Sequence, residues 1–261
     1  MRARLVEPST DQILTYCADD PVERVFLEDV ARRGHGRFAA LEHDDGKIAA
    51  LCHLGTNVVP SGVGSAAFVD LAARAGPRML IGEQEAVTEL WEAGRRRFDR
   101  PREDRPGQPV YVSTESPDPG GTGLREATHT DLEVLVPACA RAHYEEVGVD
   151  PLRRDPNGFR WRTRAQIDEG RSWVWVEDGV ILFKAEASAW TPAAVQLQQV
   201  WVDPPARTKG NATRALRDLI RLLLERVPAV CLFVRAENTP AIRLYEAVEM
   251  RRVLAYRSVL F

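Results

Sequence analysis

Residues 198–227 read QQVWVDPPARTKGNATRALRDLIRLLLERV, and this stretch decides the fold. It begins with an apolar run typical of a strand, continues through a short loop, and ends in an amphipathic helix. The helix is predicted to bury one face, because its large apolar side chains recur at intervals of three and four residues. These positions are Leu216, Leu219, Ile220, Leu223, Leu224 and Val227.

The loop between this strand and helix indicates an anion site. The first amide groups of a helix have no partner within the helix, so they point toward whatever lies over the loop. Phosphate groups commonly bind there. Gly210 permits close approach of the backbone, and the basic side chains of Arg207 and Lys209 flank the loop. A pyrophosphate group is therefore the predicted ligand.

A second unit of strand, loop and helix follows directly after the first. Residues 229–234, AVCLFV, form a short apolar run suited to a buried strand. Asn238 or Thr239 can cap the next helix, and Pro240 favours its first turn. That helix carries Tyr245. The succession of strands and helices predicts an α/β fold with a mixed sheet.

These two segments together resemble the GNAT superfamily of acyl-CoA-dependent N-acetyltransferases. The loop motif of that family, Arg/Gln-x-x-Gly-x-Gly/Ala, corresponds to residues 207–212, RTKGNA, and its Asn-x-x-Ala-x-x-x-Tyr segment corresponds to residues 238–245, NTPAIRLY. The chain is more closely similar to a bacterial subgroup in which a poorly characterised domain precedes the GNAT domain. FKAE at residues 183–186 and SVLF at residues 258–261 carry this closer resemblance.

The domain boundary is predicted at STESPDPGGTG, residues 113–123, which is rich in proline, glycine and serine. We therefore expect an N-terminal domain at 1–113, a linker at 114–123 and a GNAT domain at 124–261. Helices are expected at 21–34, 65–76 and 85–98, with strands at 78–82 and 109–114 and a hairpin around Asp45-Gly46. This order repeats that of the second half, so the prediction is two tandem GNAT-like domains.

The first of these domains is expected to be degenerate. Ser61-Gly62-Val63-Gly64 stands where its own cofactor loop would be, but it lacks the family motif. In the second half, helices are predicted from Thr130 or Asp131 and at 159–169, and a hairpin about Asp178-Gly179.

The resemblance implies roles for particular residues. Backbone groups of one strand would pair with the pantetheine arm and the thioester carbonyl, and the following loop would bind the pyrophosphate. The implied cofactor-binding residues are Val200, Trp201, Val202, Arg207, Thr208, Lys209, Gly210, Asn211, Ala212 and Asn238. For Asn238, simple capping of the next helix is an equal alternative.

Tyr245 is the candidate general acid that protonates the departing coenzyme thiolate, because a phenol stays protonated at neutral pH. The alternative is an aromatic that only fills the interface between helix and sheet. Glu186 is the candidate base, with an ordinary surface glutamate as the alternative. Many relatives have a glutamate near Gln198, which here cannot act as a base. Residues 143–146, HYEE, could recognise a cationic amine, although a solvated helix end is the favoured interpretation.

One departure from the family pattern follows the tyrosine helix. Where relatives commonly have Gly-Phe, this chain has Glu249-Met250. A glycine there tolerates a left-handed turn that glutamate resists, so we expect local strain or a modified turn.

Composition excludes several classes of protein. The formal net charge is −3 with both signs interspersed, so there is no electrostatic footprint for nucleic acid or a membrane surface. No signal peptide or long apolar run is present, which predicts a soluble cytoplasmic protein. The four cysteines lack the spacing of a metal or redox site and are expected to be buried free thiols, and no metal is expected.

The function implied is an acetyl-CoA-dependent N-acetyltransferase. Its acceptor would be a primary amine on a small molecule or peptide, attacking directly in a ternary complex without a cysteine intermediate. A non-catalytic acyl-CoA-binding sensor or regulatory protein is the alternative from a different class. Transfer to oxygen or sulfur differs only in the acceptor, and a homodimer is left open as an assembly.

Overall fold

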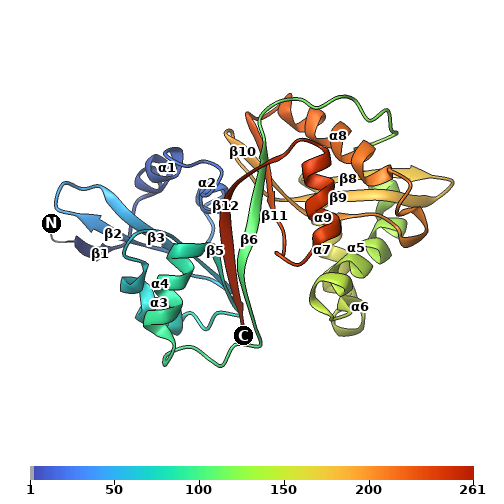
Figure 1. Cartoon of the computed structure of the whole chain (residues 1–261). Helices are drawn as coiled ribbons and strands as arrows, with labels where there is room; N and C mark the ends of the chain where they lie inside the picture. Colours follow the sequence, from blue (N-terminus) through green and yellow to red (C-terminus); the bar gives the residue numbers. More distant parts are fainter. Residues whose placement is uncertain (1–2) are drawn as a thin grey trace.

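The two halves of the chain repeat one order of helices and strands. The structure, a computed structural model, describes residues 3–261 (Figure 1). The first half contains β1 (Ala3–Val6), α1 (Thr10–Ala18), α2 (Val25–Arg32), β2 (Phe38–His43), β3 (Ile48–His53), β4 (Asn57–Gly62), α3 (Val69–Arg74), β5 (Met79–Glu83), α4 (Gln84–Gly94) and β6 (Glu103–Ser113). The second contains β7 (Arg125–Glu126), α5 (Leu132–Val147), α6 (Pro151–Arg154), α7 (Pro156–Asp168), β8 (Ser172–Glu177), β9 (Val180–Trp190), β10 (Ala194–Trp201), α8 (Asn211–Leu224), β11 (Ala229–Phe233), α9 (Thr239–Ala247) and β12 (Arg251–Leu260). Apart from the short α6, the two orders match.

All of these strands join one mixed sheet, in the order β1-β2-β3-β4-β5-β12-β6-β11-β10-β9-β8-β7. At its centre the last strands of the two halves are interleaved, and Figure 1 shows β6 and β12 side by side in the middle of the molecule. β6 pairs with β11, and β12 pairs with β5, so each half is completed by a strand of the other. Residues 114–124, which include the predicted linker, therefore join two halves that share a sheet.

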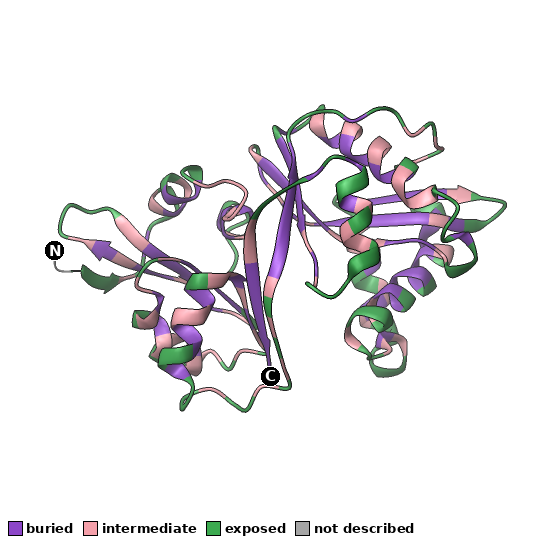
Figure 2. Cartoon of the chain, in the orientation of Figure 1, coloured by how far each residue is buried: buried purple, intermediate pink, exposed green. Residues whose placement is uncertain are grey.

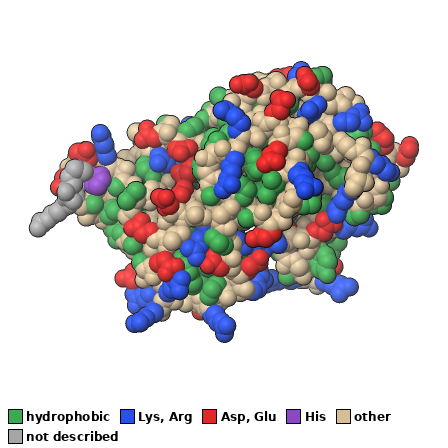
Figure 3. All heavy atoms as spheres, viewed as in Figure 1, with side chains coloured by type: hydrophobic (Ala, Val, Ile, Leu, Met, Phe, Trp, Pro, Cys, Tyr) green, Lys and Arg blue, Asp and Glu red, His purple; other side chains and the backbone are tan. Residues whose placement is uncertain are grey.

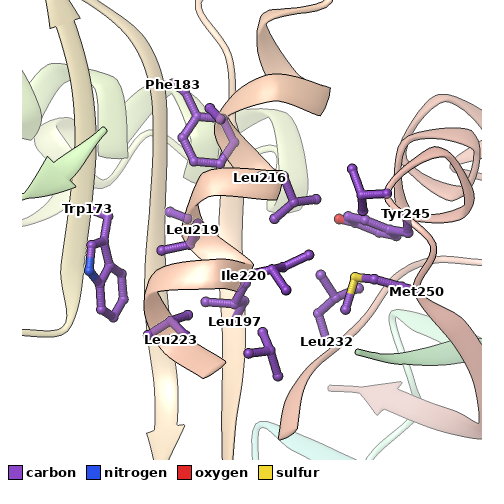
Figure 4. Packing of buried hydrophobic residues seen from close by; sticks show 14 of the residues in the cluster. Trp173, Phe183, Leu197, Leu216, Leu219, Ile220, Leu223, Leu232, Tyr245 and Met250 are labelled. Atoms are coloured by element: carbon purple, nitrogen blue, oxygen red, sulfur yellow. The ribbon is translucent and has the colours of Figure 1, made fainter. Parts of the chain in front are cut away.

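Helix α8 covers one face of the sheet in the second half, and its buried side chains form part of the main hydrophobic core there. The buried face predicted from the sequence is confirmed: Leu216, Leu219, Ile220 and Leu223 are fully buried, while Leu224 is only partly buried (Figure 4). They pack on β8, β9 and β11, and each contributes about 1.5–3 kcal/mol through burial. Figure 2 shows the same division, with buried residues along the inner strands and exposed ones on the outer helix faces.

The first half is also fixed to the second by α2, which packs on β9 and β10. At this contact the guanidinium of Arg171 donates to both carboxylate oxygens of Asp29, at 2.7 and 3.1 Å. Both side chains are buried, so removing either partner is expected to cost about 3–5 kcal/mol. This pair holds the two halves in one arrangement.

Two further local predictions from sequence are confirmed. The hairpins at Asp45-Gly46 and Asp178-Gly179 are present, and all four cysteines are free and buried. The elements β1 and α1 were not predicted, although Ser9 and Gln12 form a capping box that marks the start of α1. Within the described residues, no helix has the length and apolar character needed to cross a bilayer.

Candidate functional site

The strands β10 and β11 stop pairing at the centre of the candidate site, and the stretch over which they are unpaired is called the opening. The two strands pair only between Ala194–Gln196 and Ala229–Cys231. Farther along, β10 remains paired with β9, whereas β11 remains paired with β6. The edges that face each other beyond Gln196 therefore have no strand partner. Backbone groups on such edges can form hydrogen bonds with an extended ligand.

A bulge in β10 lies beside this opening. Two residues, Gln199 and Val200, stand opposite the single residue Ala185 of β9, and Gln199 has a left-handed backbone with φ 49°. Bulges of this kind redirect side chains and end regular pairing. Beyond it, Trp201 packs toward α5 and Val202 packs toward α8. Residues 200–202, which were predicted to hold the pantetheine arm, thus lie along the unpaired edge.

The loop after β10 leads to an uncovered helix start. The amides of Asn211, Ala212 and Thr213 donate to no acceptor within residues 3–261. Gly210, with φ 77°, has open space around its Cα, and no side chain caps the helix. Thr208 also has a left-handed backbone, which is unusual for a β-branched residue. This arrangement fits the binding of a phosphate group.

Arg207 does not point at this helix start. Its guanidinium donates to the carbonyl of Val202 at 3.0 Å and to both carboxylate oxygens of Glu145 at 2.9 and 2.8 Å. The indole of Trp201 donates to the same carboxylate at 3.3 Å. Among the described residues Lys209 has no ion-pair or hydrogen-bond partner, so it is the available cation of the loop. The favoured interpretation of Glu145 as part of a solvated helix end missed this contact.

Tyr245 lies on α9 at the other side of the opening. Its ring is buried and packs at a tilt against the ring of Tyr111 of β6, with ring centroids 5.7 Å apart. Its hydroxyl has no partner within residues 3–261 but is not fully enclosed, and in Figure 4 it points toward Leu216 of α8. Burial, with a smaller contribution from Glu146, raises the pKa of Tyr245. The phenol is therefore protonated at neutral pH, as a proton donor must be.

Glu186 is held in a buried network. Its Oε1 accepts from Lys184 Nζ at 2.7 Å and from Cys139 Sγ at 3.1 Å. Its Oε2 has no partner among the described residues and is not enclosed. Burial raises the pKa of Cys139 to about 12, so its thiol stays protonated. Glu186 is thus a paired carboxylate with one available oxygen, and Lys184 was missed by the sequence analysis.

Asn238 and Glu249 frame α9. The side chain of Asn238 accepts from the amide of Ala241 at 3.3 Å, so it caps the helix. At the other end Glu249 has φ 64°, the left-handed turn that was expected to be strained. The amide of Met250 donates to the carbonyl of Tyr245 at 3.0 Å, which closes the helix directly after the tyrosine.

Two family models match parts of this chain. Residues 137–249 match the family model described as Acetyltransferase (GNAT) family. The second half is a GNAT acetyltransferase domain. Residues 36–135 match the family described as Domain of unknown function (DUF4081). No match to a curated protein was found.

Solved structures of similar fold include tandem GNAT architecture. A GNAT-family acetyltransferase from Colwellia psychrerythraea aligns with TM-score 0.62 and 11% identity over 100% of both chains. A GCN5-related N-acetyltransferase from Sphaerobacter thermophilus aligns with TM-score 0.59 and 18% identity, over 98% of this chain and 94% of the other. A tandem GNAT protein from the clavulanic acid biosynthesis pathway aligns with TM-score 0.58 and 12% identity, over 99% and 98%. These alignments show that the fold of both halves together is shared.

A surface pocket of about 440 Å³ borders the GNAT loop. Lys209, Asn211 and Arg214 line one side, and the β8–β9 hairpin, including Glu177 and Asp178, lines the other. On the face in Figure 3, acidic and basic side chains are likewise interspersed. Within residues 3–261 no three His, Cys, Asp or Glu side chains lie close enough together to hold a metal ion.

In the first half, the loop at the corresponding position is blocked by a glutamate side chain of the same half. Glu89 of α4 accepts from the amides of Gly64 and Ser65, both at 3.0 Å. These amides are the counterparts of the uncovered ones in the GNAT domain. An acidic pocket of about 380 Å³ lies beside them. A phosphate group is therefore excluded from this position, because the Glu89 carboxylate already bonds the amides and the acidic side chains around them repel an anion.

Proposed function

We propose that this protein is an acetyl-CoA-dependent N-acetyltransferase that acts on a primary amine of a small molecule or peptide. Acetyl-CoA is the co-substrate of the GNAT family to which residues 137–249 match. The observation that carries the proposal is the opening between β10 and β11, which ends at the uncovered start of α8. An extended ligand with a diphosphate matches both features.

The residues divide the work of binding. The amides of Asn211, Ala212 and Thr213 and the ammonium of Lys209 would bind the diphosphate. Residues 200–202 on the unpaired edge of β10 would pair with the pantetheine arm. When bound, acetyl-CoA supplies the acyl group as a thioester. Holding that group next to an amine provides the proximity on which direct attack in a ternary complex depends.

Two groups would move protons. The protonated phenol of Tyr245 can donate to the departing sulfur, since its hydroxyl is not engaged elsewhere in the described chain. The free Oε2 of Glu186 can accept the proton of the attacking amine, directly or through water. The buried thiol of Cys139 stays protonated, which favours direct attack over a cysteine intermediate.

Binding and turnover test the proposal separately. Isothermal titration with acetyl-CoA and CoA should give saturable binding, and no binding at high micromolar concentration would reject it. Turnover is measured as thiol release across a panel of primary amines, with Tyr245→Phe as the matched variant. Binding without turnover on any amine would instead favour a sensor. Resistance of the product to hydroxylamine distinguishes an amide from an ester or thioester.

A further inference from the structure

Lys184 carries a charge in the interior of the protein. Its side chain is fully buried on β9, on the face that packs against α5. An ammonium group has three N–H donors, and here each has an acceptor. The distances from Nζ are 2.7 Å to Glu186 Oε1, 2.9 Å to Gln199 Oε1 and 3.2 Å to Cys139 Sγ. A buried cation is tolerated only when it is paired and bonded in this way.

The bond to Glu186 fixes one half of a carboxylate. Its Oε1 accepts hydrogen bonds from Lys184 and from the Cys139 thiol, while its Oε2 accepts none from the described residues and is not enclosed. The carboxylate therefore cannot rotate without breaking two hydrogen bonds at a buried position. Burial opposes the charge of Lys184, but Glu186 and Cys139 outweigh burial and raise the pKa of the ammonium. Lys184 is therefore charged at neutral pH.

The bond to Gln199 fixes the bulge of β10. A left-handed backbone is unfavourable for a residue other than glycine, so the bulge needs contacts that hold it. The side chain of Gln199 reaches back to Lys184 on β9 and supplies one. The conformation of Gln199 and Val200 determines how the backbone of the next residues meets the opening.

We propose that Lys184 is a positioning residue that holds the Glu186 carboxylate and the β10 bulge in fixed positions relative to one another. The role at Glu186 rests on the proposed function, because it assumes that this carboxylate accepts a proton. The role at the bulge does not. Lys184 touches neither substrate in this scheme and acts through the two groups that it binds.

Steady-state kinetics test the first role. Lys184→Met keeps the length of the side chain but removes its charge. In a Gln199→Leu background, where the contact to the bulge is already absent, it should lower kcat on the order of 100-fold while KM for acetyl-CoA changes by no more than about threefold. Because Lys184 acts on the proton acceptor through Glu186, the double variant Lys184→Met/Glu186→Gln in that same background should be no slower than Glu186→Gln in it. Arg171→Met breaks an equally buried ion pair away from the site and controls for loss of stability.

Hydrogen exchange of the ligand-free protein tests the second role. In Lys184→Met the amides of residues 199–202 should exchange at least about tenfold faster, whereas Arg171→Met should leave them unchanged. If Lys184→Met does not fold, Gln199→Leu removes the bulge contact alone and should give the same local increase. Unchanged exchange would overturn the positioning role even in a wild type without turnover. Additive kinetic effects in the double variant would overturn the role at Glu186, and an inactive wild type that still shows the exchange effect would reject only the proposed function.

Discussion

Glycine at position 249 should make this protein more stable. Glu249 is the residue after the last turn of α9, in the left-handed conformation with φ 64°. The turn is complete, because the amides of Glu249 and Met250 each donate at 3.0 Å to carbonyls of the helix. Its geometry is that of a helix end that usually contains glycine, so the backbone need not move when glycine is introduced.

The expected gain follows from two opposing terms. A left-handed backbone costs a residue with a Cβ about 1–2 kcal/mol, a cost that glycine does not have. Glycine in turn loses about 0.5–1 kcal/mol more conformational entropy on folding. Glu249→Gly should therefore raise the free energy of unfolding by about 0.5–1 kcal/mol, or Tm by about 1–4 °C. The side chain is exposed and has no hydrogen bond or ion pair within residues 3–261, so little is lost with it.

Urea unfolding followed by circular dichroism measures this difference. Glu249→Ala is the matched control, since alanine removes the carboxylate but retains the Cβ that causes the strain. The alanine variant should be no more stable than the wild type. Equal stability of the glycine and alanine variants would refute the argument from backbone strain and would point to the charge instead.

Four further changes are expected to have measurable outcomes. Tyr245→Phe should lower kcat on the order of 10²–10⁴-fold with little change in the Kd of CoA, because it removes the proton donor and keeps the packing; equal kcat would make Tyr245 a packing residue only. Glu145→Gln should release Arg207 toward the loop and tighten CoA binding about threefold to tenfold by titration calorimetry, whereas weaker binding would mean that the ion pair shapes the site. Glu89→Ala should lower the free energy of unfolding by about 1–3 kcal/mol, because two amides lose their acceptor, and an unchanged urea midpoint would contradict this. Burial raises the pKa of Glu23 to about 7, above its unfolded value, so the folded state binds the proton more tightly. The free energy of unfolding should therefore fall by about 3 kcal/mol between pH 4.5 and 7. In urea titrations at several pH values, Glu23→Gln should lose this dependence.

The parts of the fold that were predictable are those with local causes. The buried face of α8 follows from its apolar spacing, and the hairpins follow from their Asp-Gly turns. The exchange of β6 and β12 was not predictable, because pairing between strands far apart in sequence leaves no local pattern.

The candidate site divides in the same way. The uncovered start of α8 and the left-handed Glu249 could be predicted from motif and spacing. The diversion of Arg207 to Glu145 could not, because the partner lies on a helix far away in the sequence. Lys184 could have been found, since residues two apart in a strand share a face and it therefore lies beside Glu186.

The interleaving of β6 and β12 determines how short a chain can still form the sheet of the second half. A truncated chain starting after the linker would lack both β5 and β6, and would leave one edge of β11 and both edges of β12 without a partner strand. Unpaired strand edges pair with the edges of other chains, so such a fragment should aggregate rather than fold as a compact domain. The half whose own loop is blocked is thus retained as scaffolding, and any minimal version of this protein has to keep both copies.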